Sequence, residues 1–400
     1  MKPRIFISMH YLEIGGAETS LIGLLKALDP ARVEVDLFLH AHRGELMRFI
    51  PPWVNLLPEI PVYAFIERPL TEALRHGFLR LVWARLRAKW HFHRYIKRKR
   101  PTDGSAIFGY IGRYVTPTLP SLRGLGTYDL AISFLTPHDL VLRKVSARKR
   151  VAWIHTDYTR IDVDGGLELP VWNGYDYIAS VSVEVTKTFL REFPTLADKV
   201  IEIENILSPA FVRKRADEEP LPADMARKDN ETILLTIGRY SFPKKLEEIP
   251  LLCRLLIEKG QDIKWYIIGY GGSDLYIRRA ISAEGMEGRV VLLGKRVNPY
   301  PYIKACDWYV QPSRYEGKSV VVREAQMLGR PVIITAYPTA ASQVTHGVDG
   351  VVVPLPAESC AEGMSRALTN ETLRQSIISH LVSHDYGNET EVNKVIALIG

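Results

Sequence analysis

Short apolar segments alternate along the chain with longer segments whose apolar residues recur at helical spacing. In the first half, this pattern predicts strands at residues 5–8, 33–39, 130–134, 151–154, 177–181 and 200–203. An amphipathic helix is predicted at residues 18–28, between the first two strands. Strands that alternate with helices are typical of parallel βαβ units. We therefore predict a wound parallel sheet for the first half.

The alternation stops between residues 208 and 230, where three prolines and many charges replace the apolar periodicity, and it then resumes. Further strands are predicted at residues 232–237, 264–268, 290–293, 308–311 and 332–335, again separated by helices. We predict a Rossmann-like domain over 1–208, a linker over 209–230 and a second Rossmann-like domain over 231–375. A ligand is expected where the carboxyl ends of strands from both halves face each other.

The composition is that of a globular protein, with 46% hydrophobic and 24% charged residues among 400. Three cysteines are too few for a disulfide framework, so we expect a cytoplasmic protein. The net charge of +7 has a local origin: residues 73–100 contain ten Lys and Arg and no acidic residue. The remainder of the chain has 42 basic and 45 acidic residues.

Two glutamates, Glu316 and Glu324, lie eight positions apart just after a predicted strand. If a helix begins near Ser319, its free N–H groups and positive dipole end form a site for phosphate that needs no metal. Glu316 is then placed to meet a sugar hydroxyl and Glu324 to accept from ribose hydroxyls. The alternative is structural, with Glu316 as a helix-start acid and Glu324 on a solvated face.

A second group of candidate residues, Gly238 to Lys245, follows the strand at 232–237 directly. Arg239 and Lys244 place two cations at the carboxyl end of that strand, where they suit a diphosphate whose charge grows as it leaves. An ordinary basic surface loop is the alternative. The glutamate pair in the same domain, at a second strand end, favours a binding site.

These motifs combine with Ile267-Ile268-Gly269-Tyr270-Gly271 and Leu292-Leu293-Gly294 into a pattern that resembles the retaining family 4 glycosyltransferases of glycosyl transferases group 1 type. The resemblance is clear over residues 232–354. It implies the GT-B fold, which has two Rossmann-like parallel-sheet domains facing each other across a cleft. It also implies that a C-terminal helix, about residues 376–400, packs back on the first domain.

The resemblance implies that Arg239 and Lys244, beside Gly238, neutralise the leaving nucleotide diphosphate. It further implies that Glu316 contacts the sugar and that Glu324 holds the ribose. The remaining donor-binding residues that it implies in this domain are Leu293, Gly294, Gly317, Lys318 and Ser319. Lys245 departs from the family's usual glycine, and Lys318-Ser319 replaces a frequent Phe-Gly. Both positions lie near the donor sugar or phosphate, so these departures bear on the identity of the donor more than on the fold.

The first half contributes Gly15, Gly16 and His155. Gly15-Gly16 resembles the family's glycine loop, where backbone approaches the donor diphosphate, and it is not the dinucleotide pattern GxGxxG. His155 ends the predicted strand at 151–154, where similar enzymes place a histidine beside the donor sugar. A buried structural histidine is the alternative.

We expect neither a metal nor another cofactor. Asp162-Val163-Asp164 has the DxD spacing of a metal motif, but two aspartates in a glycine-rich loop arise easily by chance. His91 and His93 lie among cations and lack a third ligand.

The basic segment 73–100 contains an apolar stripe at helical spacing, formed by Leu79, Val82, Trp83, Leu86 and Trp90, with Arg and Lys on both sides. This arrangement is typical of a helix in a membrane interface, and we predict an anionic membrane as its partner. The alternative is a domain helix that packs its stripe on the sheet. Nucleic acid is not expected, because no recognition motif is present.

The sequence thus predicts an enzyme that moves a sugar from a UDP- or GDP-linked nucleotide-sugar to a hydroxyl of a glycan or lipid-linked acceptor, in capsule, lipopolysaccharide or exopolysaccharide synthesis. Two alternatives stay open. One is a nucleotide-sugar epimerase on the same scaffold, which needs no acceptor. The other is a non-catalytic membrane-docked scaffold in a polysaccharide assembly complex.

Overall fold

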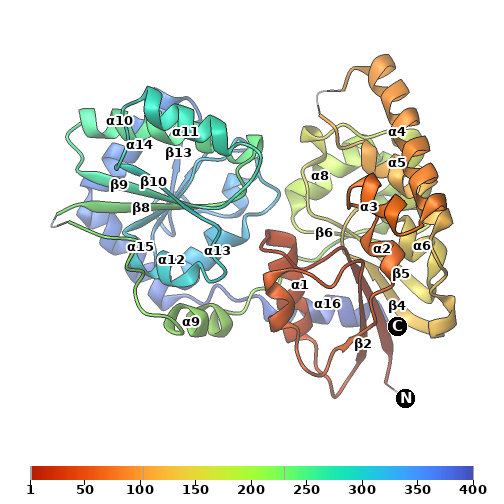
Figure 1. Ribbon diagram of the computed structural model, residues 1–400. Coiled ribbons are helices and arrows are strands. Elements are labelled where there is room, and N and C mark those ends of the chain that lie inside the picture. The colour runs from red at the N-terminus through yellow and green to blue at the C-terminus, as the bar shows by residue number, and fades with distance from the viewer. Residues whose placement is uncertain (1, 102, 229, 400) are drawn as a thin grey trace. The chain divides into compact units, whose positions relative to one another are not determined.

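The computed structural model describes residues 2–101, 103–228 and 230–399. The chain divides into two compact units, one formed by Met1–Ile206 with Glu389–Gly400 and the other by Leu207–Asn388. Each unit contains a single parallel sheet with helices on both faces (Figure 1). The two wound parallel sheets predicted from the alternation of strands and helices are therefore confirmed.

The first sheet has seven strands in the order β3-β2-β1-β4-β5-β6-β7. Chain order reverses between β1 and β4, which are neighbours, so this is the sheet's switch point. The strands are β1 (Arg4–Met9), β2 (Glu34–Leu39), β3 (Asn55–Leu56), β4 (Thr127–Ser133), β5 (Ser146–Ile154), β6 (Tyr177–Ser180) and β7 (Val200–Glu202). The helices of this unit are α1 (Gly16–Ala27), α2 (Pro61–Ala64), α3 (Leu70–Arg75), α4 (Leu79–Lys99), α5 (Ile107–Tyr114), α6 (Asp139–Lys144), α7 (Gly165–Asn173), α8 (Val183–Glu192) and α16 (Val392–Ala397).

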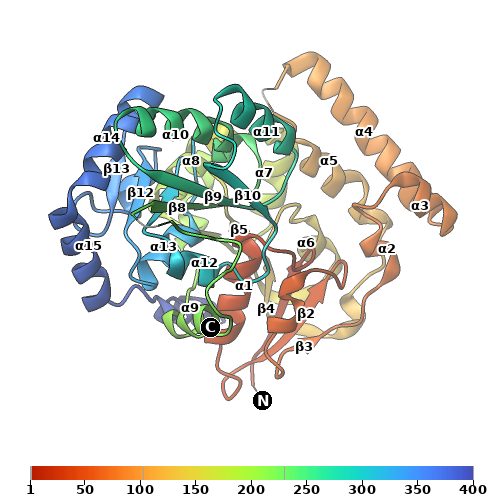
Figure 2. The same cartoon turned by 60° about the vertical axis from the view of Figure 1, so that its left-hand side comes forward.

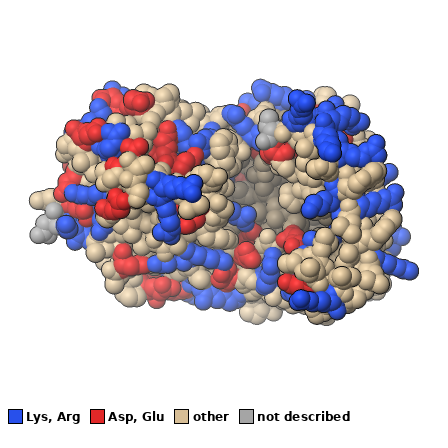
Figure 3. Space-filling view, turned by 45° about the horizontal axis from the view of Figure 1, so that its top comes forward, with Lys and Arg blue, Asp and Glu red and all other residues tan. Residues whose placement is uncertain are grey.

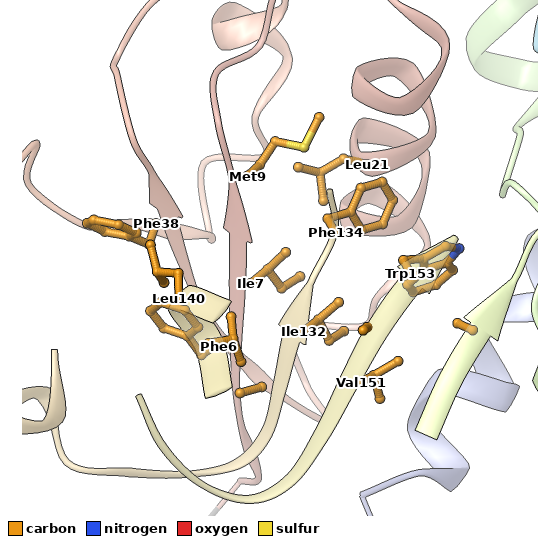
Figure 4. Packing of buried hydrophobic residues seen from close by; sticks show 14 of the residues in the cluster. Phe6, Ile7, Met9, Leu21, Phe38, Ile132, Phe134, Leu140, Val151 and Trp153 are labelled. Atoms are coloured by element: carbon orange, nitrogen blue, oxygen red, sulfur yellow. The ribbon is translucent and has the colours of Figure 1, made fainter. Parts of the chain in front are cut away.

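The core of the first unit forms between the central strands and their helices, because both faces of the sheet are covered. Figure 4 shows Phe6 and Ile7 of β1 beside Ile132 of β4 and Val151 of β5. Leu21 of α1 closes the same cluster. Burial on both faces explains why these strands are nearly continuous apolar runs and do not alternate with polar residues.

The second sheet has six strands in the order β10-β9-β8-β11-β12-β13. Its switch point lies between β8 and β11, which pair in parallel. The strands are β8 (Thr232–Ile237), β9 (Ile263–Ile268), β10 (Val290–Gly294), β11 (Trp308–Gln311), β12 (Val332–Thr335) and β13 (Val351–Val353). The helices are α9 (Pro209–Asp217), α10 (Ile249–Glu258), α11 (Asp274–Ala283), α12 (Tyr300–Ala305), α13 (Val320–Met327), α14 (Ala357–Thr369) and α15 (Glu371–Ser383).

Two segments differ from the organisation expected at the sequence level. Within the expected linker 209–230, helix α9 forms and buries Val212 and Ala216 in a core of the second unit. Within the expected C-terminal element 376–400, α15 belongs to the second unit, and the chain returns to the first unit from Glu389. There Val395 of α16 joins the first core.

Helix α4 is the longest helix of the first unit, with 21 residues, and it lies at the outer edge of that unit with α5 beside it (Figure 2). In the parts of the chain that the structure describes, no helix is both long enough and apolar enough to cross a bilayer.

Candidate functional site

The loops that follow β8 and β11 meet at the switch point of the second sheet. Because β8 and β11 are parallel neighbours, their carboxyl ends lie at the same edge, with residues 238–245 after one strand and 312–319 after the other. In open parallel sheets, ligands bind outside the carboxyl ends of the strands at such a point. The sequence prediction named residues in both loops.

Lys244 and Glu316 form an ion pair across these two loops. Lys244 Nζ lies 2.7 Å from Glu316 Oε1. The same oxygen accepts hydrogen bonds from Gln311 Nε2 at 2.8 Å and from Ser313 Oγ at 2.5 Å. Gln311 and Ser313 are fully buried, so the carboxylate is held on its protein side by side chains that are packed in place. The three donors Lys244, Gln311 and Ser313 share one oxygen and so fix the orientation of the carboxylate. The Lys244 side chain stays partly accessible to solvent.

Glycines allow the loops after β8 and β9 to touch. A Cβ on Gly269 would lie 1.9 Å from the carbonyl oxygen of Gly238, so only glycine fits there. Gly238 itself has the aliphatic part of Lys244 lying over it, with Cδ 3.3 Å from the position of an added Cβ. Tyr240 N donates to Tyr270 O at 2.8 Å and joins the two loops. The glycine spacing therefore positions Lys244.

Lys245 occupies the position where the family usually has glycine, and its backbone shows the reason for that preference. Its φ is 55° and its ψ 32°, in the left-handed region. Its side chain turns away from the ion pair: Nζ donates to Leu355 O at 2.8 Å and pairs with Glu248. Lys245 thus adopts the left-handed conformation itself, and its side chain places no second ammonium group at Glu316.

Helix α13 begins at Val320 with Ser319 at the N-cap position, as predicted. The Ser319 side chain makes no capping hydrogen bond, while its carbonyl accepts from Gln343 Nε2 at 2.9 Å. Thr339 Oγ1 donates to the Glu316 carbonyl at 3.0 Å and holds the preceding turn. The first-turn N–H groups of α13 are thus not satisfied by a Ser319 cap and remain suited to an anion.

Glu324 lies inside the second unit and not on a solvated face, so that alternative is wrong. Its side chain is 3% exposed, and Tyr300 Oη donates to its Oε1 at 2.7 Å. Burial raises the pKa of Glu324 from 4.5 to about 7, against the lowering effect of the Tyr300 hydrogen bond. This carboxyl is therefore a buried acceptor with a titration near neutral pH.

The remaining predicted residues of this unit surround the same sheet edge. Leu293 is buried in a core of the second unit, at the end of β10, and Gly294 has φ 71°. Arg239 is exposed on the β8 loop, and Lys318 follows Gly317 just before α13.

In the first unit, the predicted residues follow different strands. Gly15 is the N-cap of α1, in an extended conformation, and Gly16 is its first residue, close after β1. His155 follows β5, with its ring centroid 4.9 Å from that of Phe134. Burial lowers the pKa of His155 to about 4, against the opposing hydrogen bond with the Phe134 backbone, so the imidazole is neutral at pH 7.

The DxD aspartates have structural partners. Asp164 Oδ2 accepts from Tyr110 Oη at 2.7 Å, and Asp162 Oδ2 accepts from Asp103 N at 3.1 Å. His91 stacks on Tyr114 with ring centroids 4.6 Å apart. Across residues 2–101, 103–228 and 230–399, no group of three or more His, Cys, Asp and Glu side chains is arranged to hold a metal ion.

The sequence interpretation missed Gln311, Ser313 and Tyr300. Gln311 is a polar residue at the end of an apolar strand, and Ser313 follows two positions later; this signal resembles the one that identified Glu316. Tyr300 had no such signal, because its contact with Glu324 joins positions 24 residues apart.

Residues 217–380, which fill most of the second unit, match the family model of glycosyl transferases group 1. This part of the second unit is therefore similar to the glycosyl transferases group 1 family. Alpha-D-kanosaminyltransferase of Streptomyces kanamyceticus is 26% identical to this chain over 185 residues, which are 45% of the chain and 47% of that protein. N-acetylgalactosamine-N,N'-diacetylbacillosaminyl-diphospho-undecaprenol 4-alpha-N-acetylgalactosaminyltransferase of Campylobacter jejuni is 30% identical over 156 residues, 38% of this chain and 41% of that protein. The chain thus spans about half the length of these curated relatives, or less.

Solved structures that cover the whole chain confirm the GT-B fold. TarM of S. aureus has a TM-score of 0.67 at 13% identity and covers 100% of both chains. HepE of Anabaena, solved in complex with UDP and glucose, has a TM-score of 0.66 at 17% identity and covers 99% of this chain and 98% of its own. OtsA, a trehalose-6-phosphate synthase, has a TM-score of 0.67 at 14% identity, covering 99% of this chain and 98% of its own.

Proposed function

We propose that the protein is a retaining, metal-independent glycosyltransferase that moves a sugar from a nucleotide-sugar to an acceptor hydroxyl. The observation that carries this proposal is the Lys244–Glu316 ion pair at the switch point of the second sheet, next to the N-terminus of α13. A cation and an open helix N-terminus stabilise the negative charge that grows on a leaving diphosphate. The family match to residues 217–380 supports the same reaction.

Each residue of the site has a distinct part in the proposed reaction. Lys244 and Arg239 neutralise the diphosphate as the sugar leaves. Glu316, held by Gln311 and Ser313, accepts from sugar hydroxyls and fixes the sugar's orientation. Glu324 accepts from ribose hydroxyls. The departing diphosphate takes the acceptor's proton on the same face, so retention needs no strong protein nucleophile.

The nucleotide is proposed to be UDP, with GDP as the second choice, because HepE was solved with UDP and glucose. The acceptor is proposed to be a glycan or a lipid-linked glycan. The Campylobacter relative is named for a diphospho-undecaprenol substrate, and a relative in Erwinia amylovora for amylovoran biosynthesis. We place the enzyme in the cytoplasm, in the synthesis of a capsule, lipopolysaccharide or exopolysaccharide.

A panel of UDP- and GDP-sugars, screened by calorimetry and by release of the nucleoside diphosphate, tests the proposal. We expect Lys244→Ala and Glu316→Ala to lower turnover by about 10²–10³-fold, the usual effect of removing one electrostatic contact to a transition state. Lys245→Ala is the matched control, since Lys245 Nζ binds Leu355 O and Glu248 instead of Glu316. Full activity of either alanine variant, or an equal loss in the control, would refute the site assignment.

The epimerase and scaffold alternatives give different results in the same assay. An epimerase converts the sugar without an acceptor, and a scaffold need not bind a nucleotide-sugar at all. We expect binding by the wild type and formation of a glycoside only when an acceptor is present. Conversion of the donor into an epimer in the absence of acceptor would overturn the proposed reaction while leaving the donor site in place.

A further inference from the structure

Helix α4 presents its largest apolar side chains to solvent. Leu79, Trp83, Leu86 and Trp90, which we name the α4 ridge, are 63%, 61%, 50% and 55% exposed. Their spacing of four, three and four residues places them along one stripe of the helix. Contiguous exposed apolar side chains of this size are unusual on a soluble domain and mark an interaction surface.

The opposite face of α4 is the one that packs. Leu81, Ala84, Ala88 and Tyr95 are buried. Ala88 and Tyr95 join Tyr110 of α5 in a small apolar cluster, so α4 rests on α5 through small and aromatic residues. The alternative in which the apolar stripe packs on the sheet is therefore wrong for the ridge; Val82 is the stripe residue that contacts the core.

Cations border the ridge and stack on its aromatic rings. The Arg87 guanidinium carbon lies 5.3 Å from the ring centroid of Trp83, and that of Arg94 lies 4.8 Å from that of Trp90. Arg80 and Lys89 are exposed, and in the described part of the chain no carboxylate pairs with these four cations. Figure 3 shows Lys and Arg along the side of the first unit where α4 lies in Figure 1.

We propose that the α4 ridge docks the protein on an anionic phospholipid bilayer, with the helix lying in the plane of the interface. A helix of 21 residues is about 32 Å long, and an interfacial helix buries its apolar face by roughly 5–10 Å. Arg87 and Arg94 then reach lipid phosphates while Trp83 and Trp90 sit at headgroup level. This docking is independent of the donor chemistry in the second unit.

The charge and the apolar ridge together favour an anionic bilayer over a second copy of the chain or a nucleic acid. A second copy of the chain would place α4 against α4 in a two-fold contact, and segments with ten cations and no acidic residue would repel each other. Nucleic acid would accept the cations but not an apolar ridge at their centre. An anionic bilayer satisfies both the ridge and its flanks.

Flotation with vesicles tests the proposal. The probes are phosphatidylcholine alone and phosphatidylcholine mixed with phosphatidylglycerol. We expect binding to the mixed vesicles and a loss of at least about tenfold in partition coefficient for Trp83→Ser with Trp90→Ser. Arg80→Ser and Lys89→Ser should each lower it by about fivefold, because a cation near an anionic surface contributes ~1 kcal/mol.

Two further variants separate docking from folding. Trp83→Phe with Trp90→Phe keeps the apolar ridge and should retain binding, and Val382→Ser removes a 72% exposed apolar side chain from α15 and should change nothing. The far-UV circular dichroism spectrum and the thermal melt should be the same in all variants, which shows that the first unit is folded. Equal binding to both vesicle types, or full binding by the serine double variant, would overturn the proposal. The proposal would also be overturned if the wild type sediments as a dimer and the serine double variant sediments as a monomer.

Discussion

Replacing Glu324 with glutamine should make the protein more stable at mildly basic pH. Glu324 is 3% exposed and accepts one hydrogen bond, from Tyr300 Oη. Its ionised form therefore lacks hydration, and the pKa is raised to about 7. Glutamine has nearly the same size, keeps an oxygen that can accept from Tyr300, and never ionises.

The magnitude follows from the pKa. A rise from 4.5 to about 7, at about 1.4 kcal/mol per unit, corresponds to about 3 kcal/mol. Because the folded-state pKa lies above the unfolded value, the stability that the bound proton contributes is present below the unfolded pKa. It is lost as the pH rises through the folded pKa. Glu324→Gln should match the wild type near pH 4 and exceed its free energy of unfolding by up to about 3 kcal/mol near pH 8.

Urea denaturation of wild type and variant at both pH values measures this difference. Glu168 of the first unit also has a pKa raised by burial to about 7, but it is present in both proteins and cancels in the comparison. Glu358→Gln, at an exposed position of α14, removes the same charge without a buried group and is the matched control. A stability difference that does not change between the two pH values would refute the reasoning. The variant should also bind the nucleotide more weakly, since a neutral amide oxygen is a weaker acceptor for the ribose hydroxyls than a carboxylate. Such exchanges of stability for function are common at binding sites.

Three further outcomes follow from local geometry. Gly269→Ala should unfold the second unit or destabilise it by several kcal/mol in thermal melts, because its Cβ would lie 1.9 Å from Gly238 O, whereas Gly272→Ala, with open space around it, should be neutral. Lys245→Gly should be more stable than Lys245→Ala by about 1 kcal/mol in denaturant titrations, because the position has φ 55°; equal stabilities would contradict this. His155 should remain neutral from about pH 5 upward in an NMR titration, since its pKa is about 4, and a midpoint near 6.5 would contradict the burial argument.

Local patterns in the sequence were sufficient for most of the fold. Every predicted strand of the second half is present, because buried parallel strands are short apolar runs between helical segments. Strands β3 and β13 were missed because they are short: β3 has two residues and β13 has three. Helix α9 was missed within the expected linker because its many charged residues obscure the helical spacing of Val212 and Ala216. These two residues bury the helix in a core of the second unit.

The candidate site also has residues that the sequence predicts and residues that only the tertiary structure places there. Glycine spacing and strand-end charges identify Lys244 and Glu316, since chemistry at the edge of a parallel sheet follows directly from chain order. The partners that fix them, Gln311 and Ser313, depend on which loops the sheet order brings together. The pKa of Glu324 depends on burial, which no local pattern specifies.

The sequence by itself determined two wound parallel sheets, the resemblance of the second half to a glycosyltransferase family, and a helix with an apolar stripe between cations, because these are periodic or local properties of the chain. Only the tertiary structure decided which face of α4 is free. An apolar stripe packs inward whenever a partner surface is available. Here α5 takes the face with Ala88 and Tyr95, so that Trp83 and Trp90 are left exposed. Whether the apolar stripe of α4 forms core or an interaction surface depends on which neighbouring elements pack against the helix. The spacing of apolar residues along the sequence does not contain that information.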